Sequence, residues 1–203
     1  MFSFGVMAAQ TIEKNKMTTY TIGLLVFDDV EELDFIGPLE VFNTMNDIAA
    51  KTDVDATNKT VFISQSGKDI TGTRGMRISM DCSLVDAPEL DVLCIPGGSG
   101  AAREIYKKQL PDWIAATASR CTWVAGLNTG VILLTAAGLT GGKKLTNARS
   151  AYVRDGNLLT STGTTAGIDM CLWLTGRLHS IALALATQRN MNHQRQPAIS
   201  AFG

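Results

Sequence analysis

Two turns and one acidic side chain are placed where the groups of a catalytic or binding site commonly lie. Residues 123–142 read as a strand, a tight turn and a buried helix, with Asn128 at the tip of the turn. In this arrangement, the nucleophile elbow, the tip side chain projects above a sheet and the amides of the following helix can stabilise an anion. Asparagine is not an ordinary nucleophile. We therefore interpret Asn128 either as a group that binds or orients a substrate through its amide, or as a residue that only tolerates a left-handed backbone.

Asp34 is the acidic candidate, and it lies in the segment EELDFIGP. Its neighbours Leu33 and Phe35 predict partial burial, which raises the pKa of a carboxyl group and suits proton transfer. We expect a helix directly after Asp34, with Pro38 near its first turn. The alternative is that Asp34 caps this helix or is a solvated acid in a turn.

A glycine-rich loop, PGGSG at residues 96–100, follows the apolar run of residues 90–95. Because glycine has no side chain, the backbone N–H groups of Gly97, Gly98 and Ser99 could approach a ligand closely. Glycines after a strand are also common in ordinary turns, so the loop alone is weak evidence of a site.

The elements that must position these residues alternate between strands and helices. Apolar runs and side-chain alternation predict strands within residues 22–27, 60–64, 74–80, 90–95 and 121–125. An Asp-Gly turn predicts a hairpin over 152–161, and helices are expected over about 101–119 and 162–185. This order indicates an α/β sandwich with a mostly parallel sheet, whose ligands bind beyond the carboxyl ends of the strands. Asp34, the PGGSG loop and Asn128 all follow strand ends, so we expect them to converge on one pocket.

Length and composition favour one domain without nucleic acid or membrane as partner. The chain has 203 residues, 45% hydrophobic and 18% charged, with a net charge of −1. No basic cluster and no apolar run of membrane-spanning length stands out. We expect residues 17–203 to form a single domain and residues 1–16 a loose extension, because the extension lacks the basic start of a secretory signal.

Cysteine and histidine usage argues against a disulfide framework or a metal site. The widely spaced cysteines are Cys82, Cys94, Cys121 and Cys171. Without a C-x-x-C pair, and with three of them in apolar runs, they indicate reduced core thiols in the cytoplasm. The histidines His179 and His193 show no partner pattern, and we expect them at the surface. We expect neither a metal nor a cofactor.

In their order and spacing these motifs resemble the PfpI/ThiJ superfamily, and within it the isonitrile hydratase branch. The matching pieces are IGLLVFDDVEELDFIGPLEVF, APELDVLCIPGGSG, TGVILLTAAGLTGGKKLT and VRDGNLLTSTGTTAGIDMCLWL, which cover most of residues 22–174. The resemblance implies a flavodoxin-like three-layer sandwich of the class I glutamine amidotransferase type. It also implies a homodimer, which a shortened segment after Lys144 supports because apolar surface would be left uncovered.

The resemblance also assigns roles at the elbow, where the family reads cysteine-threonine-glycine with the cysteine as nucleophile. The family's functional positions fall here on the following residues: the nucleophile on Asn128, the next two turn residues on Thr129 and Gly130, the acid that shuttles a proton on Asp34, and the oxyanion-binding loop on Gly98 and Ser99.

Two departures separate the sequence from the family pattern. The nucleophile is replaced by Asn128. Further on, where the family usually reads threonine-threonine-histidine-tryptophan, residues 146–149 read TNAR, and about one helix of residues is missing before Val153. An engineered change of the cysteine alone would leave that histidine in place, so its absence favours natural divergence.

The resemblance implies an isonitrile hydratase-like protein, a lyase that adds water to an isonitrile carbon to give an N-substituted formamide. Without a thiol, Asp34 would act as general acid or base on a bound water that Asn128 orients, and thiol-dependent activity is not expected. One alternative is a catalytically inactive relative that binds a small molecule or has a regulatory role. The other is a non-hydratase enzyme that uses the same pocket.

Overall fold

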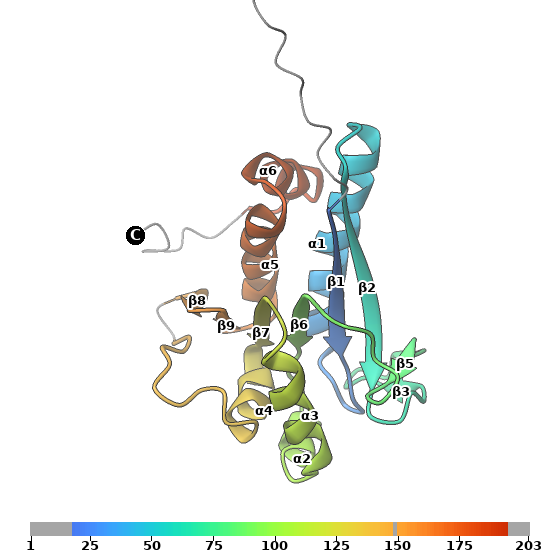
Figure 1. Cartoon of the computed structure of the whole chain (residues 1–203), viewed down its shortest axis with the longest axis vertical. Coiled ribbons are helices and arrows are strands. Elements are labelled where there is room, and N and C mark those ends of the chain that lie inside the picture. Colours follow the sequence, from blue (N-terminus) through green and yellow to red (C-terminus); the bar gives the residue numbers. More distant parts are fainter. Residues whose placement is uncertain (1–17, 148–149, 195–203) are drawn as a thin grey trace, which may run out of the picture.

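A seven-stranded sheet with helices on both faces makes up the computed structural model, which describes residues 18–147 and 150–194 (Figure 1). The strands of this sheet are β1 (Thr18–Leu25), β2 (Ala56–Ser64), β5 (Cys82–Ser83), β6 (Val92–Ile95), β7 (Trp123–Leu127), β8 (Tyr152–Asp155) and β9 (Leu158–Ser161). Their order is β5-β2-β1-β6-β7-β9-β8, and only β8 and β9 pair in antiparallel fashion. The predicted α/β sandwich with a mostly parallel sheet is confirmed. The extension predicted at residues 1–16 lies outside the described residues.

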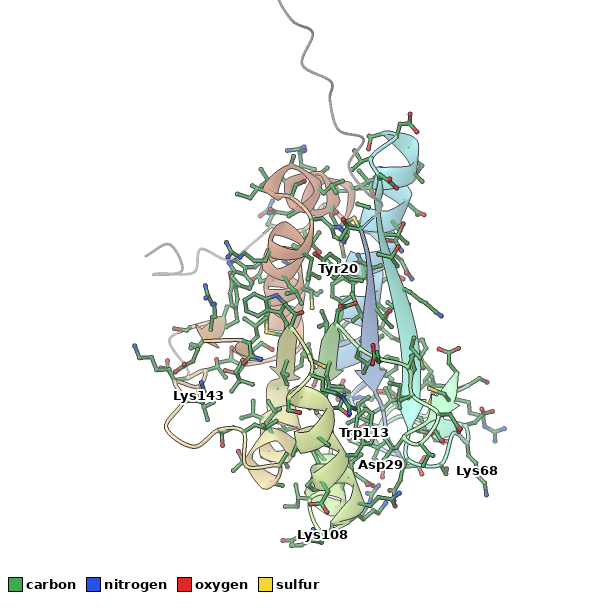
Figure 2. The ribbon with its side chains drawn as sticks, viewed as in Figure 1. Tyr20, Asp29, Lys68, Lys108, Trp113 and Lys143 are labelled. Carbon is green, nitrogen blue, oxygen red and sulfur yellow. The ribbon has the colours of Figure 1, made fainter. Side chains whose placement is uncertain are left out.

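Helices and one small hairpin complete the fold. The helices are α1 (Glu32–Lys51), α2 (Ala101–Glu104), α3 (Gln109–Ala118), α4 (Val131–Ala136), α5 (Thr164–Leu178) and α6 (Ile181–Asn190). Helices α1, α5 and α6 pack against one another, while α4 packs against α2 and α3. The strands β3 (Ile70–Thr71) and β4 (Arg77–Ile78) form a separate antiparallel pair. Tyr20 lies near the start of β1, and Asp29 lies beyond the carboxyl end of the same strand (Figure 2).

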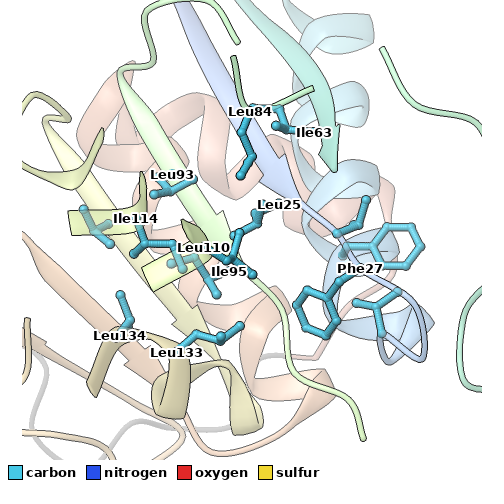
Figure 3. Close-up of a cluster of buried hydrophobic side chains, with 14 of the residues drawn as sticks. Leu25, Phe27, Ile63, Leu84, Leu93, Ile95, Leu110, Ile114, Leu133 and Leu134 are labelled. Atoms are coloured by element: carbon cyan, nitrogen blue, oxygen red, sulfur yellow. The ribbon is translucent and has the colours of Figure 1, made fainter. Parts of the chain in front are cut away.

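Alternate residues of the central strands face two different hydrophobic layers. In β6, Val92 and Cys94 pack with residues of α1 and α5, whereas Leu93 and Ile95 pack with residues of α3 and α4. Figure 3 shows the second layer, where the strand side chains meet Leu110, Ile114, Leu133 and Leu134. This period of two is the geometry of a strand buried on both faces, and it explains why the strand sequences read as continuous apolar runs.

Two helices that the sequence predicts as continuous are each broken. The helix expected over residues 101–119 divides into α2 and α3, and Pro111 lies in the first turn of α3, where a missing N–H is tolerated. The helix expected over 162–185 ends at Leu178, and α6 begins after Ser180. The backbone of Ser180 is extended and its Oγ accepts a hydrogen bond from the Leu183 N–H at 3.2 Å, which is an N-cap.

Strand and helix boundaries also differ from several predictions. The strand expected over residues 74–80 is only β4, and Cys121 precedes β7 instead of lying in it. Asp34 was expected before a helix that starts near Pro38, but both lie inside α1. The hairpin predicted at 152–161 is confirmed as β8 and β9, with Gly156 at a φ of 65° in its turn.

The two histidines were expected at the surface without partners, and this prediction is wrong. His179 Nε2 lies 2.9 Å from Asn58 Oδ1, and the imidazole also meets the Tyr20 ring edge to face. His193 Nε2 lies 2.9 Å from Asp169 Oδ1. Both partners are distant in sequence and buried, so no local pattern could indicate them.

Candidate functional site

Loops that follow β1, β6 and β7 meet at the carboxyl edge of the sheet. The Gly97 N–H donates a hydrogen bond to Asp34 Oδ2 at 3.0 Å, and the Gly98 N–H donates one to Thr129 Oγ1 at 3.0 Å. The Glu31 N–H donates to the Gly97 carbonyl at 2.9 Å. The acid, the glycine loop and the elbow therefore meet as predicted, whereas the pocket expected between them stays a prediction.

Asp34 lies in the first turn of α1 and has no exposed surface. Burial raises its pKa from the usual 3.8 to about 6. The Gly97 N–H and the Asn128 side chain both favour the charged form and lower this pKa in part, while the charge of Glu31 raises it. The Asn128 side chain lowers this pKa although no hydrogen bond of regular geometry joins it to the carboxyl group. Asp34 Oδ1 has no partner among the described residues. The site therefore holds a buried carboxyl group with a raised pKa and one oxygen that has no partner among the described residues.

Asn128 occupies the tip of the turn between β7 and α4. Its φ is 52°, so the left-handed backbone expected for the elbow is confirmed. Asparagine is among the few residues other than glycine that adopt this conformation readily. The side chain is half-exposed beside a fully covered Asp34, whereas Thr129 is exposed. A reacting molecule can reach the Asp34 carboxyl only after a neighbouring side chain moves.

Close packing around the glycines holds these loops together. A Cβ on Gly97 would lie 2.5 Å from Thr129 Oγ1 and 2.8 Å from Asp34 Oδ2, and a Cβ on Gly130 would lie 2.2 Å from the Ile95 carbonyl oxygen. Gly98 has a φ of 129°, which strains any other residue. From the sequence alone, the Gly97 and Gly98 N–H groups are expected to face a ligand. In the structure both N–H groups donate within the site, and a ligand would have to compete with Asp34 and Thr129 for them.

Two further acids border the site and were not identified from the sequence. Glu31 lies directly before α1, and its Oε2 is 3.9 Å from Arg74 Nη2. Glu32 is buried, and its Oε1 accepts a hydrogen bond from the Arg74 N–H at 2.6 Å. The consecutive glutamates before Asp34 were a visible signal. The loop that carries Arg74 is more than 40 positions from Glu32 in the sequence, and no local pattern indicated that the two would meet.

Two cavities of the protein lie away from Asp34 and Asn128. A cavity of about 550 Å³ borders Trp113, and one of about 560 Å³ borders Leu185. Neither is lined by Asp34 or Asn128. Within residues 18–147 and 150–194, no three His, Cys, Asp or Glu side chains gather closely enough to hold a metal ion. In the same part of the chain, every helix is too short or too polar to cross a membrane.

Comparisons with known proteins identify the family to which the chain is similar. The model of the DJ-1/PfpI family matches residues 20–176. The isonitrile hydratase of Pseudomonas putida is 30% identical over 191 residues, which cover 87% of this chain and 79% of that protein. The HTH-type transcriptional regulator GbdR of Pseudomonas aeruginosa is 25% identical over 209 residues, which cover 90% of this chain but only 56% of the regulator.

Solved structures share the fold at lower identity. A THiJ/PfpI family protein from Pseudomonas syringae superposes with a TM-score of 0.77 at 24% identity, over 98% of this chain and 86% of that chain. DJ-1beta of Drosophila melanogaster superposes with a TM-score of 0.73 at 19% identity, over 87% of this chain and 100% of that chain. These two likenesses concern the flavodoxin-like architecture alone.

Proposed function

The chain belongs to the DJ-1/PfpI family, and from that premise we propose that it adds water to a small isonitrile through proton transfer by Asp34. The observation that carries the proposal is the buried Asp34 carboxyl, with a pKa of about 6 and one unpartnered oxygen beside the elbow. The similarity to an isonitrile hydratase supports the choice of substrate class. Asn128 has no thiolate, so the reaction must proceed without a covalent intermediate on residue 128.

Acid catalysis offers such a route because the terminal carbon of an isonitrile carries a lone pair. Protonated Asp34 donates its proton to this carbon, which forms a C–H bond and leaves a nitrilium ion beside the carboxylate. A water molecule then attacks the same carbon and forms the C–O bond. The carboxylate accepts the proton that the water loses, and the resulting formimidic acid tautomerises to the formamide. Asp34 returns to its starting form.

In the proposed reaction, the turn residues orient the reacting molecules and hold the two loops together. The half-exposed Asn128 amide orients the water or the substrate next to Asp34. Thr129 and Gly130 hold the elbow against the PGGSG loop, through the Gly98 hydrogen bond and the close approach to Ile95. Ser99 is exposed at the end of the same loop and is the remaining candidate for a substrate contact.

The test is hydration of cyclohexyl isocyanide between pH 5 and pH 8, with the formamide measured by NMR and a protein-free blank at each pH. We expect slow turnover that declines as the pH rises through about 6, because the donor is the protonated carboxyl group. Asp34→Asn should lower the rate by about a hundredfold or more, and iodoacetamide should not change it. Asp55→Asn, which alters an exposed carboxylate, is the matched control. An unchanged rate in Asp34→Asn, or a rate abolished by alkylation, would refute the proposal.

A second candidate is a relative that binds a small molecule without converting it. The asparagine at the elbow tip and the similarity to a transcriptional regulator favour it. If the protein only binds the small molecule, N-cyclohexylformamide or cyclohexyl isocyanide should shift the NMR signals of Asn128 and Gly97. No formamide should then accumulate above the protein-free blank. A non-hydratase enzyme would instead bind neither compound and still require Asp34 for its own reaction.

A further inference from the structure

A cavity of about 550 Å³ lies at the end of the sheet opposite Asp34, and the proposed reaction does not use it. The strand β6 spans the distance, since Asp91 precedes it at the cavity and Gly97 follows it at the candidate site. The walls of the cavity are the start of β1, the loop between β5 and β6, and the second half of α3. Its volume is in the range of sites for small organic molecules.

The walls of this cavity are fixed by specific contacts. Trp113 Nε1–H donates a hydrogen bond to the Leu84 carbonyl at 2.9 Å, which ties the loop to α3. Asp91 Oδ2 accepts a hydrogen bond from the Thr21 N–H at 2.8 Å, and the Asp91 N–H donates to the Thr21 carbonyl at 2.9 Å. Leu90 packs directly over β1, where any Cβ on Gly23 would approach Leu90 Cδ1 to 2.5 Å.

Charges of both signs line the cavity. Glu89 and Asp91 contribute carboxylates from the loop, and Arg120 contributes a guanidinium group from the segment after α3. None of the three forms an ion pair with another side chain of residues 18–147 and 150–194. The cavity therefore offers partners for both a cation and an anion.

Part of the remaining wall is apolar. Leu84 and Pro88 on the loop and Trp113 on α3 contribute carbon surface, and Val85 beside them is 85% exposed. Because the Trp113 N–H is already bonded to the Leu84 carbonyl, the indole offers its ring for packing. A ligand that fits carries two opposite charges and an apolar group.

We propose that this cavity binds a zwitterionic α-amino acid with a large apolar side chain. The ammonium group lies against Glu89 and Asp91, the carboxylate pairs with Arg120, and the side chain packs on Trp113. A guanidinium group suits the carboxylate because it can donate two parallel hydrogen bonds. The site is separate from Asp34 and does not depend on the proposed hydration.

The experiment titrates the ¹⁵N-labelled full chain with L-phenylalanine, phenethylamine and 3-phenylpropionate, which differ only in their charged groups. L-Phenylalanine should shift the Trp113 indole signal with a Kd of about 1 mM or tighter, and each single-charge analogue should bind at least about tenfold more weakly. Arg120→Gln and Glu89→Gln should each cost a similar factor. Both positions are exposed, so neither variant is expected to affect folding. Arg77→Gln, an exposed arginine on β4, should leave the affinity unchanged.

Three results would overturn the proposal. One is the absence of any Trp113 shift at 20-fold the stated Kd, about 20 mM. Another is equal affinity for all three probes, and the last is full affinity in Arg120→Gln. Hydration of cyclohexyl isocyanide by Arg120→Gln should equal that of the unaltered protein, so failure at this cavity is distinguishable from failure at Asp34.

Discussion

Burial of the Asp34 carboxyl group lowers the stability of the protein by an amount that depends on pH. Its folded-state pKa is raised to about 6 from 3.8, so the native chain binds this proton more tightly than the unfolded chain does. The contribution of Asp34 to stability is fully present below pH 3.8 and is lost as the pH rises through 6. Asp34→Asn should therefore raise the free energy of unfolding at pH 7.5, on the order of 1–2 kcal/mol after allowance for screening at the edge of the sheet.

Urea unfolding at pH 4 and pH 7.5 measures this effect. The gain should be small at pH 4, where Asp34 is protonated in the folded chain and only partly ionised in the unfolded chain. The exposed control Asp55→Asn should show no comparable change. If Asp34→Asn is less stable than the unaltered protein at both pH values, the hydrogen bond from Gly97 outweighs the cost of burying the carboxyl group.

Asn128→Cys should create thiol-dependent hydration. The elbow geometry and the nearby Asp34 are already present, and cysteine is a few per cent thiolate at neutral pH and strongly nucleophilic. Formamide production from cyclohexyl isocyanide should rise above that of the unaltered protein and should be abolished by iodoacetamide. Asn128→Ser, which lacks the soft nucleophile, is the matched control and should not gain activity. Equal rates in the two variants would contradict this expectation.

At the scale of single residues, the sequence predicted that Asp34 and Asn128 lie together at the candidate site, but not which residues surround them. Asp34 and Asn128 were found because each sits in a local pattern, an acid between apolar residues and a polar turn between apolar runs. Glu32 was missed because its hydrogen-bond partner, the Arg74 N–H, comes from a loop far along the chain. The Gly97 N–H was assigned to a ligand because nothing local shows that it bonds to Asp34 instead.

At the scale of elements, the junction between α5 and α6 depends on one hydroxyl group. Ser180→Ala removes the N-cap that accepts from the Leu183 N–H, and should lower the free energy of unfolding by about 0.5–2 kcal/mol. Ser119→Ala is a suitable control, because the Ser119 hydroxyl donates only to the Ala116 carbonyl of its own helix. Urea denaturation followed by circular dichroism measures both. Equal losses in the two variants would argue against a special role of the cap.

The same junction should make the protein sensitive to acid. Burial lowers the pKa of His179 below its usual 6.5, so the neutral imidazole is favoured in the folded chain. Its contribution to stability is present above pH 6.5 and is lost as the pH falls through the lowered folded-state pKa. His179→Gln should therefore lose less stability than the unaltered protein between pH 7.5 and pH 5. An identical loss in both proteins would exclude His179 as the cause.

Elements were predicted well where one strand pattern or turn dominates and poorly where two signals compete. The buried strands and the β8–β9 hairpin follow from apolar runs and an Asp-Gly turn. The break at Ser180 was missed because apolar residues continue at helical spacing on both sides of it, and the choice to cap a new helix depends on packing of α6 against α1 and α5. The two-residue strands β3 and β5 are too short to leave a periodic signal.

At the scale of the whole molecule, we expect a homodimer. Ile181 and Leu185, one turn apart on α6, are 73% and 47% exposed, and exposed apolar stripes of this kind are commonly covered. Sedimentation at micromolar concentration should give twice the 21.7 kDa mass of one chain. If α6 contributes to the interface, the double variant Ile181→Lys and Leu185→Lys should sediment as a monomer, whereas Tyr106→Lys, at another exposed position, should not. A monomer at all concentrations would contradict the expectation.

The strand order has a consequence for the chain as it leaves the ribosome. The strand β1 pairs on one side with β2, which is made soon afterwards, and on the other side with β6, whose first residue is Val92. Until that segment emerges, the nascent unit of β1, α1 and β2 exposes an unpaired strand edge and the side chains that it contributes to each hydrophobic layer. Such intermediates pair readily with other chains, and parallel pairing across a long sequence separation is slow. The rate of translation through residues 65–95 therefore bears on how much of the protein is recovered in soluble form.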